Sequence, residues 1–340
     1  MQKKMMYAAI AVVVVIVVAA VGVVLLNQPG SAAGPNAKIV LIKKTPSSVA
    51  YSPLDVNAVY NKSYPLSRFL YLYTNGVPSN TSSLHEWLAY IYNAQQGGKD
   101  IDNAGFYVLQ QSDMNAMLAQ LSHPNATGPS GDFKEGGSTT MTEVANLWEA
   151  GFKAATGHTV TLSAGGSGVG IQQFLAGTID VAQASRAMTP AEWATAKTNH
   201  INCTEWKVAV DGLSIIVNKD NPVTTLNLEQ LEGLFNGTYK YWDDDQMGGN
   251  HVAVTLYGRD DASGSYASFK DLVLVHPPKA YASSMLQANS NALILPEVEN
   301  DKGGVGYVGI GYAKEASGQS STASQISAAL MMSVDGIKLW

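Results

Sequence analysis

Three short stretches of the chain place glycine next to serine or threonine, each just ahead of a helical pattern. They read "GGSTT" at 136–140, "AGGSGVG" at 164–170 and "RDDASGS" at 259–265. The start of a helix offers unpaired backbone N–H donors and the positive end of the helix dipole, and glycine lets an anion approach the backbone. Arg259 adds a guanidinium that can hold an oxyanion with two hydrogen bonds. Together the loops predict a site for phosphate, sulfate or a carboxylate.

A purely structural explanation competes for each loop taken alone. Helix N-caps are rich in serine, threonine and glycine, and Asp, Ser and Gly are common turn residues. One such loop would therefore be a weak sign, whereas three loops with an arginine are a much stronger one. None of them is followed by Gly-Lys-Ser/Thr, so the spacing of a nucleotide-binding P-loop is missing from the sequence.

The segments around these loops alternate between helical and strand patterns. The stretch 141–157 spaces Val144, Leu147 and Trp148 along one helical face and ends at Gly157. Further strands are expected at 158–162, 211–218 and 251–258, and further helices at 168–177, 227–237 and 266–274. Strands that alternate with helices favour an α/β fold with a mostly parallel sheet.

Composition narrows the classes of protein. The 340 residues suffice for two lobes, and a net charge of −6 without a basic stripe argues against a nucleic-acid partner. The single cysteine, Cys203, excludes an internal disulfide and a cysteine-based metal cluster. The 6 histidines lack metal-ligand spacing, and the loop serines have no evident base beside them. We therefore expect no enzyme, no metal and no cofactor.

The N-terminal part of the chain carries an uncharged apolar run at 7–26, preceded by lysines. This run is long enough to cross a bilayer as a helix, and the positive-inside rule would leave the rest of the chain outside the cytoplasm. The favoured interpretation is an uncleaved anchor over 1–27 with a flexible linker over 28–37, and the alternative is a cleaved secretory signal. Both place the body at the cell surface or in the periplasm. Glycosylation is predicted at Asn61, Asn80, Asn125, Asn202 and Asn236.

Four blocks between residues 136 and 316 resemble the phosphate-binding proteins of the high-affinity phosphate ABC transporters, which have the type II periplasmic-binding-protein fold. The blocks are "GGSTTMTEVANLWEAGFKAATGHTVTLSAGGSGVGIQQFLAGTIDVAQASRAM", "VDGLSIIVNKDNPVTTLNLEQLEGLFNGTYKYW", "LYGRDDASGSYASFKDLV" and "GGVGYVGIGYAKEA". Their most specific feature is Arg-Asp-X-X-Ser-Gly-Ser together with Gly-Gly-Ser-Gly. The resemblance implies a two-lobed α/β protein that captures phosphate for the permease of an ABC importer.

Carried over by position, the resemblance places the oxyanion against hydroxyl and backbone groups of the three loops. The implied ligands are Thr139, Thr140, Ser167, Ser185, Arg259, Ser263, Gly264 and Ser265. Asp261 would orient Arg259, which would supply the only full positive charge placed directly on the anion. Arg259 would lie at the surface of the cleft, where an arginine contributes little to the core.

One position departs from the pattern of many relatives. Where they often carry an aspartate after Ala-Ser, this chain has Arg186 after Ser185. That aspartate accepts the proton of phosphate, which is how sulfate is rejected. Many relatives share the Ser-Arg version, so the resemblance still implies anion binding, with Arg186 as a second, supporting cation. Selectivity for phosphate over sulfate stays open.

A second departure concerns the order of the segments. "YPLSRFLYLYTNG" at 64–76 and the stretch that follows resemble the C-terminal end of the family, yet they stand ahead of the first loop. This order predicts a circular permutant, because permutation is tolerated where the original termini lie close together. The expected parts are a first lobe over 38–205, which includes the moved segment 38–121 and a joining loop at 122–137, a second lobe over 206–302, and crossing strands over 303–340 that return to the first lobe.

The permuted order also makes geometric predictions. Strands at 208–218 and 304–312 would cross between the lobes, and residues 63–76 would lie beside the second of these strands. The anion site would occupy the cleft between the lobes, at the carboxyl ends of strands.

Two functions compete at this point. The first is a membrane-anchored, extracytoplasmic binding protein for phosphate or a similar oxyanion. The second is a structural surface subunit, a filament or coat, that uses the same fold and assembles by segment swapping. The loops discriminate between them, since a structural descendant has no need for Arg259 together with Ser263 and Ser265.

Overall fold

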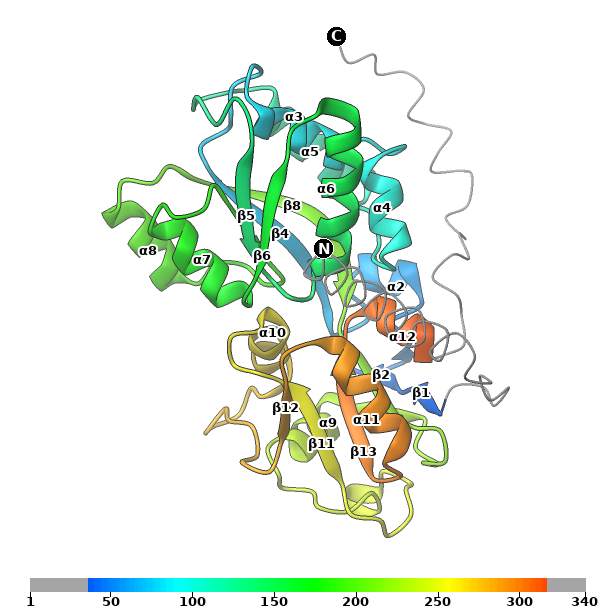
Figure 1. The fold of residues 1–340 in the computed structure, drawn as a ribbon. Coiled ribbons are helices and arrows are strands. Elements are labelled where there is room, and N and C mark those ends of the chain that lie inside the picture. The colour runs from blue at the N-terminus through cyan, green and yellow to red at the C-terminus, as the bar shows by residue number, and fades with distance from the viewer. Residues whose placement is uncertain (1–35, 317–340) are drawn as a thin grey trace, which may run out of the picture. The chain divides into compact units, whose positions relative to one another are not determined.

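A computed structural model describes residues 36–316, which belong to one compact unit (Figure 1). Within this unit two lobes are each built on a five-stranded sheet. The expected anchor over 1–27, most of the linker over 28–37 and the end of the chain after residue 316 lie outside the described residues. Between 36 and 316, no helix combines the length and apolar character that a membrane crossing requires.

The sheet of the first lobe has the strand order β6-β5-β7-β4-β8. β5 pairs in parallel with β6 and β7, whereas β4 runs antiparallel to both of its neighbours. The strands are β4 (Ser67–Asn75), β5 (Phe133–Gly137), β6 (Val160–Ala164), β7 (Val181–Ala184) and β8 (Cys203–Gly212). The predicted α/β class is confirmed, but the sheet is mixed because β4 is inserted in the opposite direction.

Helices cover both faces of this sheet (Figure 1). On one face Ile171 and Phe174 pack against Tyr73 of β4, and on the other Trp87 and Trp148 form an aromatic cluster. The helices are α3 (Ser83–Tyr92), α4 (Gly97–Asn103), α5 (Gln111–Leu121), α6 (Thr142–Thr156), α7 (Ser167–Leu175) and α8 (Pro190–Thr198). α6 ends, as the sequence predicts, at a glycine in the left-handed region.

The sheet of the second lobe has the strand order β1-β9-β13-β11-β12. Its strands are β1 (Ala37–Ile39), β9 (Ser214–Asn218), β11 (Thr255–Arg259), β12 (Leu286–Ala288) and β13 (Gly304–Val308). Its helices are α9 (Leu228–Phe235), α10 (Gly264–Val273) and α11 (Ile294–Asn300). Phe235, Phe269 and Tyr307 are fully buried between α9, α10 and the sheet.

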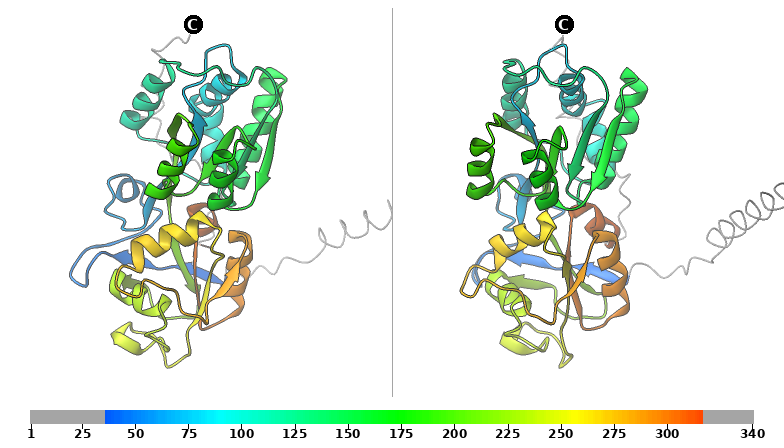
Figure 2. Two further views of the ribbon diagram at one scale, coloured as in Figure 1. Left: turned by 90° about the vertical axis from the view of Figure 1, so that its left-hand side faces the viewer. Right: turned by 60° about the vertical axis from the view of Figure 1, so that its left-hand side comes forward.

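A small sheet, two short α-helices and two 3-10 helices, Asp244–Gln246 and Asn291–Leu293, complete the described part. The sheet has the order β10-β2-β3, with β2 (Leu41–Lys43), β3 (Ala50–Tyr51) and β10 (Thr225–Asn227). The α-helices are α2 (Val56–Tyr60) and α12 (Ile310–Ala316). Since β1 pairs with β9 and β2 pairs with β10, residues 37–51 lie with the second lobe, and the expected start of the first lobe at residue 38 is wrong. Figure 2 shows these blue strands among the elements of the second lobe.

The two lobes are joined where β8 leads into β9. β8 belongs to the first sheet and β9 to the second, so the crossing predicted at 208–218 is confirmed. The N–H of Leu213, between the two strands, donates to the carbonyl of Leu66, just before β4. The chain therefore also passes between the lobes ahead of β4, directly beside the first crossing.

Two geometric predictions about the crossings are wrong. β13 stays in the second lobe, because both of its edges pair there with β9 and β11, and the chain then turns into α12. β4 pairs with β7 and β8 along its length, so residues 67–75 form no strand pairing with 304–312.

The joining loop expected at 122–137 also contains a strand, β5. Its pattern is hard to recognise in the sequence, because the charged residue Glu135 occupies a buried position of the strand.

Candidate anion-binding site

The second and third glycine loops lie against each other through their backbones. A Cβ on Gly166 would fall 2.2 Å from the carbonyl oxygen of Ala262, and one on Gly264 would fall 2.3 Å from the hydroxyls of Ser167 and Ser185. Any larger side chain at these glycines would push the loops apart. Glycine is therefore required at both positions for the loops to meet.

The first loop joins the third through hydroxyl contacts. The hydroxyl oxygens of Thr140 and Ser265 lie 2.9 Å apart, and Thr140 is 5% exposed while Ser265 is fully buried. Ser167, in the second loop, accepts a 3.0 Å hydrogen bond from the N–H of Ser185, and their hydroxyl oxygens lie 3.4 Å apart. The structure therefore brings together the three loops that the sequence predicts as one site.

Ser263 and Gly264 lie at the start of α10. The Ser263 hydroxyl accepts a 3.1 Å hydrogen bond from the N–H of Ser265, which makes it the N-cap of that helix. This cap occupies one lone pair of the hydroxyl and leaves its proton available for donation. The backbone N–H groups at the start of α10 thus lie beside the serine and threonine hydroxyls of the other loops.

Arg259 is fully buried at the end of β11. Its guanidinium donates to the carbonyls of Ala288 at 3.1 Å and Asn289 at 2.8 Å, to Oδ1 of Asn291 at 3.2 Å, and to the hydroxyl of Thr139. All of these acceptors are uncharged. Burial lowers the pKa of Arg259, because removal from water disfavours the charged form. Arg259 is thus a buried cation, and the expectation that it lies at the surface of the cleft is wrong.

Asp261 does not orient Arg259 in the way that the resemblance implies. Asp261 is exposed, and among the described residues the guanidinium donates to none of its oxygens. Asn291, which is 2% exposed and lies in a short turn after β12, holds the guanidinium instead. The carboxylate of Asp261 does not hold the guanidinium, because the side chain of Asp261 points to solvent.

Arg186 lies at the edge of the cleft and already has a carboxylate partner. Its guanidinium makes two 2.7 Å hydrogen bonds to the two oxygens of Glu192, which is also the acid of a capping box with Thr189 at the start of α8. The hydrogen bonds to Glu192 raise the pKa of Arg186. The supporting cation expected from the sequence is therefore largely neutralised.

The sequence reasoning missed a second buried arginine. Arg68 of β4 is 9% exposed, and it pairs with the fully buried Asp211 of β8 at 2.6 Å. It also donates to the Ser265 hydroxyl at 2.9 Å. A lone charge inside each of two apolar strand patterns, "LSRFLYLY" and "VAVDGLSIIV", is the signal that could have revealed this pair.

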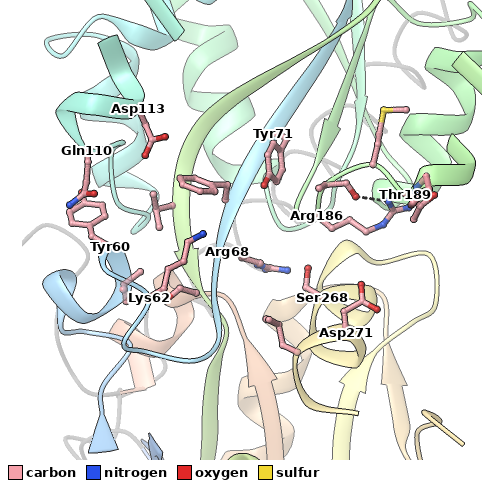
Figure 3. A pocket seen from close by; sticks show the side chains of 18 residues that line it. Tyr60, Lys62, Arg68, Tyr71, Gln110, Asp113, Arg186, Thr189, Ser268 and Asp271 are labelled. Carbon is pink, nitrogen blue, oxygen red and sulfur yellow. Dashed lines mark hydrogen bonds between the residues drawn. The ribbon is translucent and has the colours of Figure 1, made fainter. Parts of the chain in front are cut away.

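A cavity of 410 Å³ lies next to Arg68 and Arg186, and none of the residues that line it belongs to the three glycine loops (Figure 3). Arg68, Tyr71 and Arg186 line it from the first lobe, and Ser268 and Asp271 line it from α10 in the second. The cavity therefore lies between the two lobes. Within 36–316, no group of three or more His, Cys, Asp or Glu side chains is arranged to hold a metal ion.

Comparison with known proteins shows the family to which the chain belongs. A family model described as a PBP superfamily domain matches residues 124–337. The chain belongs to the PBP superfamily. Two curated relatives are phosphate-binding proteins PstS: that of Staphylococcus haemolyticus is 30% identical over 182 residues, covering 53% of this chain and 56% of the relative, and that of Pseudomonas aeruginosa is 28% identical over 202 residues, covering 56% and 62%. The predicted resemblance to phosphate-binding proteins is confirmed. The chain spans only about 60% of the length of these relatives.

Solved structures of similar proteins have been found as well. The crystal structure of a phosphate-binding protein of a phosphate ABC transporter from Streptococcus pneumoniae covers 61% of this chain and 71% of its own, with 23% identity and a TM-score of 0.45.

Proposed function

We propose that this member of the PBP superfamily is an extracytoplasmic binding protein that captures an inorganic oxyanion, phosphate above all, for an ABC importer. The observation that carries the proposal is the environment of Arg259, a fully buried cation whose hydrogen bonds in the described part of the chain go to uncharged oxygens. A buried charge is costly unless an opposite charge compensates it. An anion held between the three loops would provide that compensation.

Polar atoms without partners support the same ligand. The hydroxyl of Ser138 and the Nδ2 of Asn291 are buried, and neither has a hydrogen-bond partner among the described residues. Ser138 directly precedes Thr139, and Asn291 holds Arg259. Buried donors are nearly always satisfied in folded proteins, and each one left unpaired carries a penalty. A multivalent acceptor such as phosphate is suited to a site with several such donors.

The proposed ligands are those that the resemblance implies: Thr139, Thr140, Ser167, Ser185, Arg259, Ser263, Gly264 and Ser265. Because Arg186 is paired with Glu192, this position offers neither the carboxylate that would accept the proton of phosphate nor a free charge. Hydroxyl groups, which both donate and accept, would have to receive that proton. We therefore expect weaker discrimination between phosphate and sulfate than in a site with an aspartate there.

The similarity to the phosphate-binding proteins PstS, together with the apolar run at 7–26, supports a place outside the cytoplasm with an ABC permease as partner. The favoured form keeps the N-terminal segment as an anchor. The asparagines of the five sequons are exposed, so glycosylation stays a prediction with accessible sites: Asn61, Asn80, Asn125, Asn202 and Asn236. The family match and the buried cation favour a binding protein over a structural subunit that assembles by segment swapping.

Circular permutation is part of the proposal. The family match begins at residue 124, yet β4, from the segment ahead of it, occupies an interior position in the same sheet as β5 to β8. More than a third of each curated relative lies outside its match with this chain. A rearranged chain in which the segment 36–121 follows residue 316 through a flexible linker should fold and bind like the parent. Failure of this rearranged chain to fold, with linkers of several lengths, would count against permutation.

Calorimetry on the full-length protein tests the proposed function. The titrants are phosphate, sulfate, molybdate and a dicarboxylate, each at fixed pH and ionic strength. We expect one binding site per chain for phosphate and tighter binding of the tetrahedral oxyanions than of the dicarboxylate. Absence of binding by all four anions would overturn the proposal and favour the structural subunit.

A further inference from the structure

Arg68 contacts the proposed anion site without being one of its expected ligands. Its Nη2 donates to the Ser265 hydroxyl at 2.9 Å, and its Nη1 donates to the backbone carbonyl of Ser185 at 3.2 Å. Both serines are proposed ligands, one from each lobe. Arg68 therefore links the third glycine loop to the segment after β7, where the N–H of Ser185 donates to Ser167 of the second loop.

The position of the Arg68 guanidinium is fixed by Asp211. Oδ2 of Asp211 accepts hydrogen bonds from Nε of Arg68 at 2.9 Å and from Nη2 at 2.6 Å. Oδ1 of the same carboxylate accepts from the N–H of Ile310, at the start of α12, at 2.9 Å. The aspartate is fully buried on the strand that crosses between the lobes. A guanidinium fork held in this way has little freedom to change its contacts.

The contact with Arg68 determines what the Ser265 hydroxyl can do. A guanidinium has donors and no acceptor, so it occupies a lone pair of the serine oxygen and cannot receive the hydroxyl proton. That proton must be donated elsewhere, and the side of Ser265 that faces Thr140, at 2.9 Å, is where the glycine loops converge. A donor polarised by a neighbouring cation also forms a stronger hydrogen bond.

We propose that Arg68 is a positioning residue of the anion site, which fixes the Ser265 hydroxyl as a donor and so selects an unprotonated oxygen of the anion at that position. This inference rests on the proposed function. It assigns to Arg68 a role in recognition that acts through Ser265, and to Asp211 the role of holding Arg68 in place. A merely structural role for the ion pair would not depend on Ser265.

A double-mutant cycle measured by phosphate calorimetry on the full-length protein tests this role. The variants are Arg68→Lys, Ser265→Ala and the two together. A lysine keeps the charge but cannot hold Asp211, the Ser185 carbonyl and Ser265 at once. We expect Arg68→Lys to weaken phosphate binding roughly tenfold in the parent. In the Ser265→Ala background, the same change should weaken binding less than about twofold, since the hydroxyl it acts on is gone.

Asp211→Asn provides a second cycle with Ser265→Ala, should Arg68→Lys fail to fold. The asparagine is nearly the same shape and weakens the hold on the guanidinium, so the same dependence on Ser265 is expected. Equal losses of affinity in both backgrounds would overturn the inference while leaving the proposed function intact. If the parent protein binds no phosphate, the proposed function fails, and this inference fails with it.

Discussion

Arg259 and Arg186 were both expected to serve the anion, but their surroundings differ. Arg259 is fully buried and donates to uncharged oxygens in the described structure, whereas Arg186 lies at the edge of the cleft with both of its terminal nitrogens on Glu192. The carboxylate of Glu192 cancels most of the field of Arg186. The charge available to an anion is therefore that of Arg259. What separates the two arginines is whether the guanidinium is already hydrogen-bonded to a carboxylate.

Glu135 extends this comparison to a buried acid. It is fully buried in β5, where Oε2 accepts a 2.9 Å hydrogen bond from the indole of Trp87 and Oε1 has no partner among the described residues. Burial raises its pKa to about 8, so this carboxyl can avoid its charge by holding a proton at neutral pH. An arginine has no such option at physiological pH. Of these two buried groups, only Arg259 keeps its charge, and the carboxylate that acts on it, that of Asp260, does so through space without a hydrogen bond among the described residues.

The largest effect is expected from Arg259→Met. Methionine fills most of the buried volume, but it removes the charge and the donors that the anion requires. Loss of a charge-assisted pair in a closed site costs about 2–5 kcal/mol, which weakens phosphate affinity by a factor of roughly 30 to several thousand. Calorimetry measures the affinity, and circular dichroism checks the fold. If the variant is folded and binds phosphate as well as the parent, Arg259 only supports the turn.

A smaller effect on stability is expected from Glu135→Gln. The carboxyl has an ordinary pKa of 4.5 when unfolded and a pKa of about 8 when folded, so the folded state binds the extra proton between these values. Stability contributed by this proton is fully present below pH 4.5 and declines by at most about 1.4 kcal/mol per pH unit as the pH rises toward 8.

Glutamine keeps an acceptor for Trp87 and cannot ionise, so the variant should lack this decline. Urea unfolding of parent and variant at several values between pH 5 and 8 measures the difference in their free energies of unfolding. Parallel pH profiles for the two proteins would show that Glu135 is already ionised in the folded state.

The smallest effect is expected from Arg186→Gln, which serves as the matched control for Arg259→Met. Because Glu192 compensates Arg186, loss of this charge should change phosphate affinity by no more than about threefold. Both affinities are measured under the same ionic conditions. A loss comparable to that of Arg259→Met would mean that the pair with Glu192 opens when the anion binds, and the comparison between the two arginines would then fail.

The features that the sequence predicts well are those with a clear local pattern. The apolar period of α6 and its final glycine placed that helix within a residue of its observed ends, and the three glycine loops do meet. Each loop contains its own signal, since glycine, hydroxyl groups and a following helix are adjacent in the chain. The first crossing between the lobes also follows from one continuous apolar stretch.

Long-range pairings explain most of what the sequence did not predict. Nothing near Arg259 indicates that Asn291 holds it, and the pattern of β4 does not show that β8 is its neighbour. Asp261 lies only two residues from Arg259 in the chain, but its side chain is exposed. The Arg68–Asp211 pair joins two strands that are far apart in the chain, and only the fold brings the two charges together.

A crystal structure of the full-length protein with arsenate would test the central claim most directly. Arsenate has the shape and charge of phosphate, and the anomalous scattering of arsenic locates it without reference to the protein density. We predict one strong arsenic peak per chain between the three glycine loops, within hydrogen-bond reach of Arg259 and of the hydroxyls of Thr139 and Ser265. Arsenic only at exposed lysines, or none at saturating arsenate with the loops well ordered, would contradict the account.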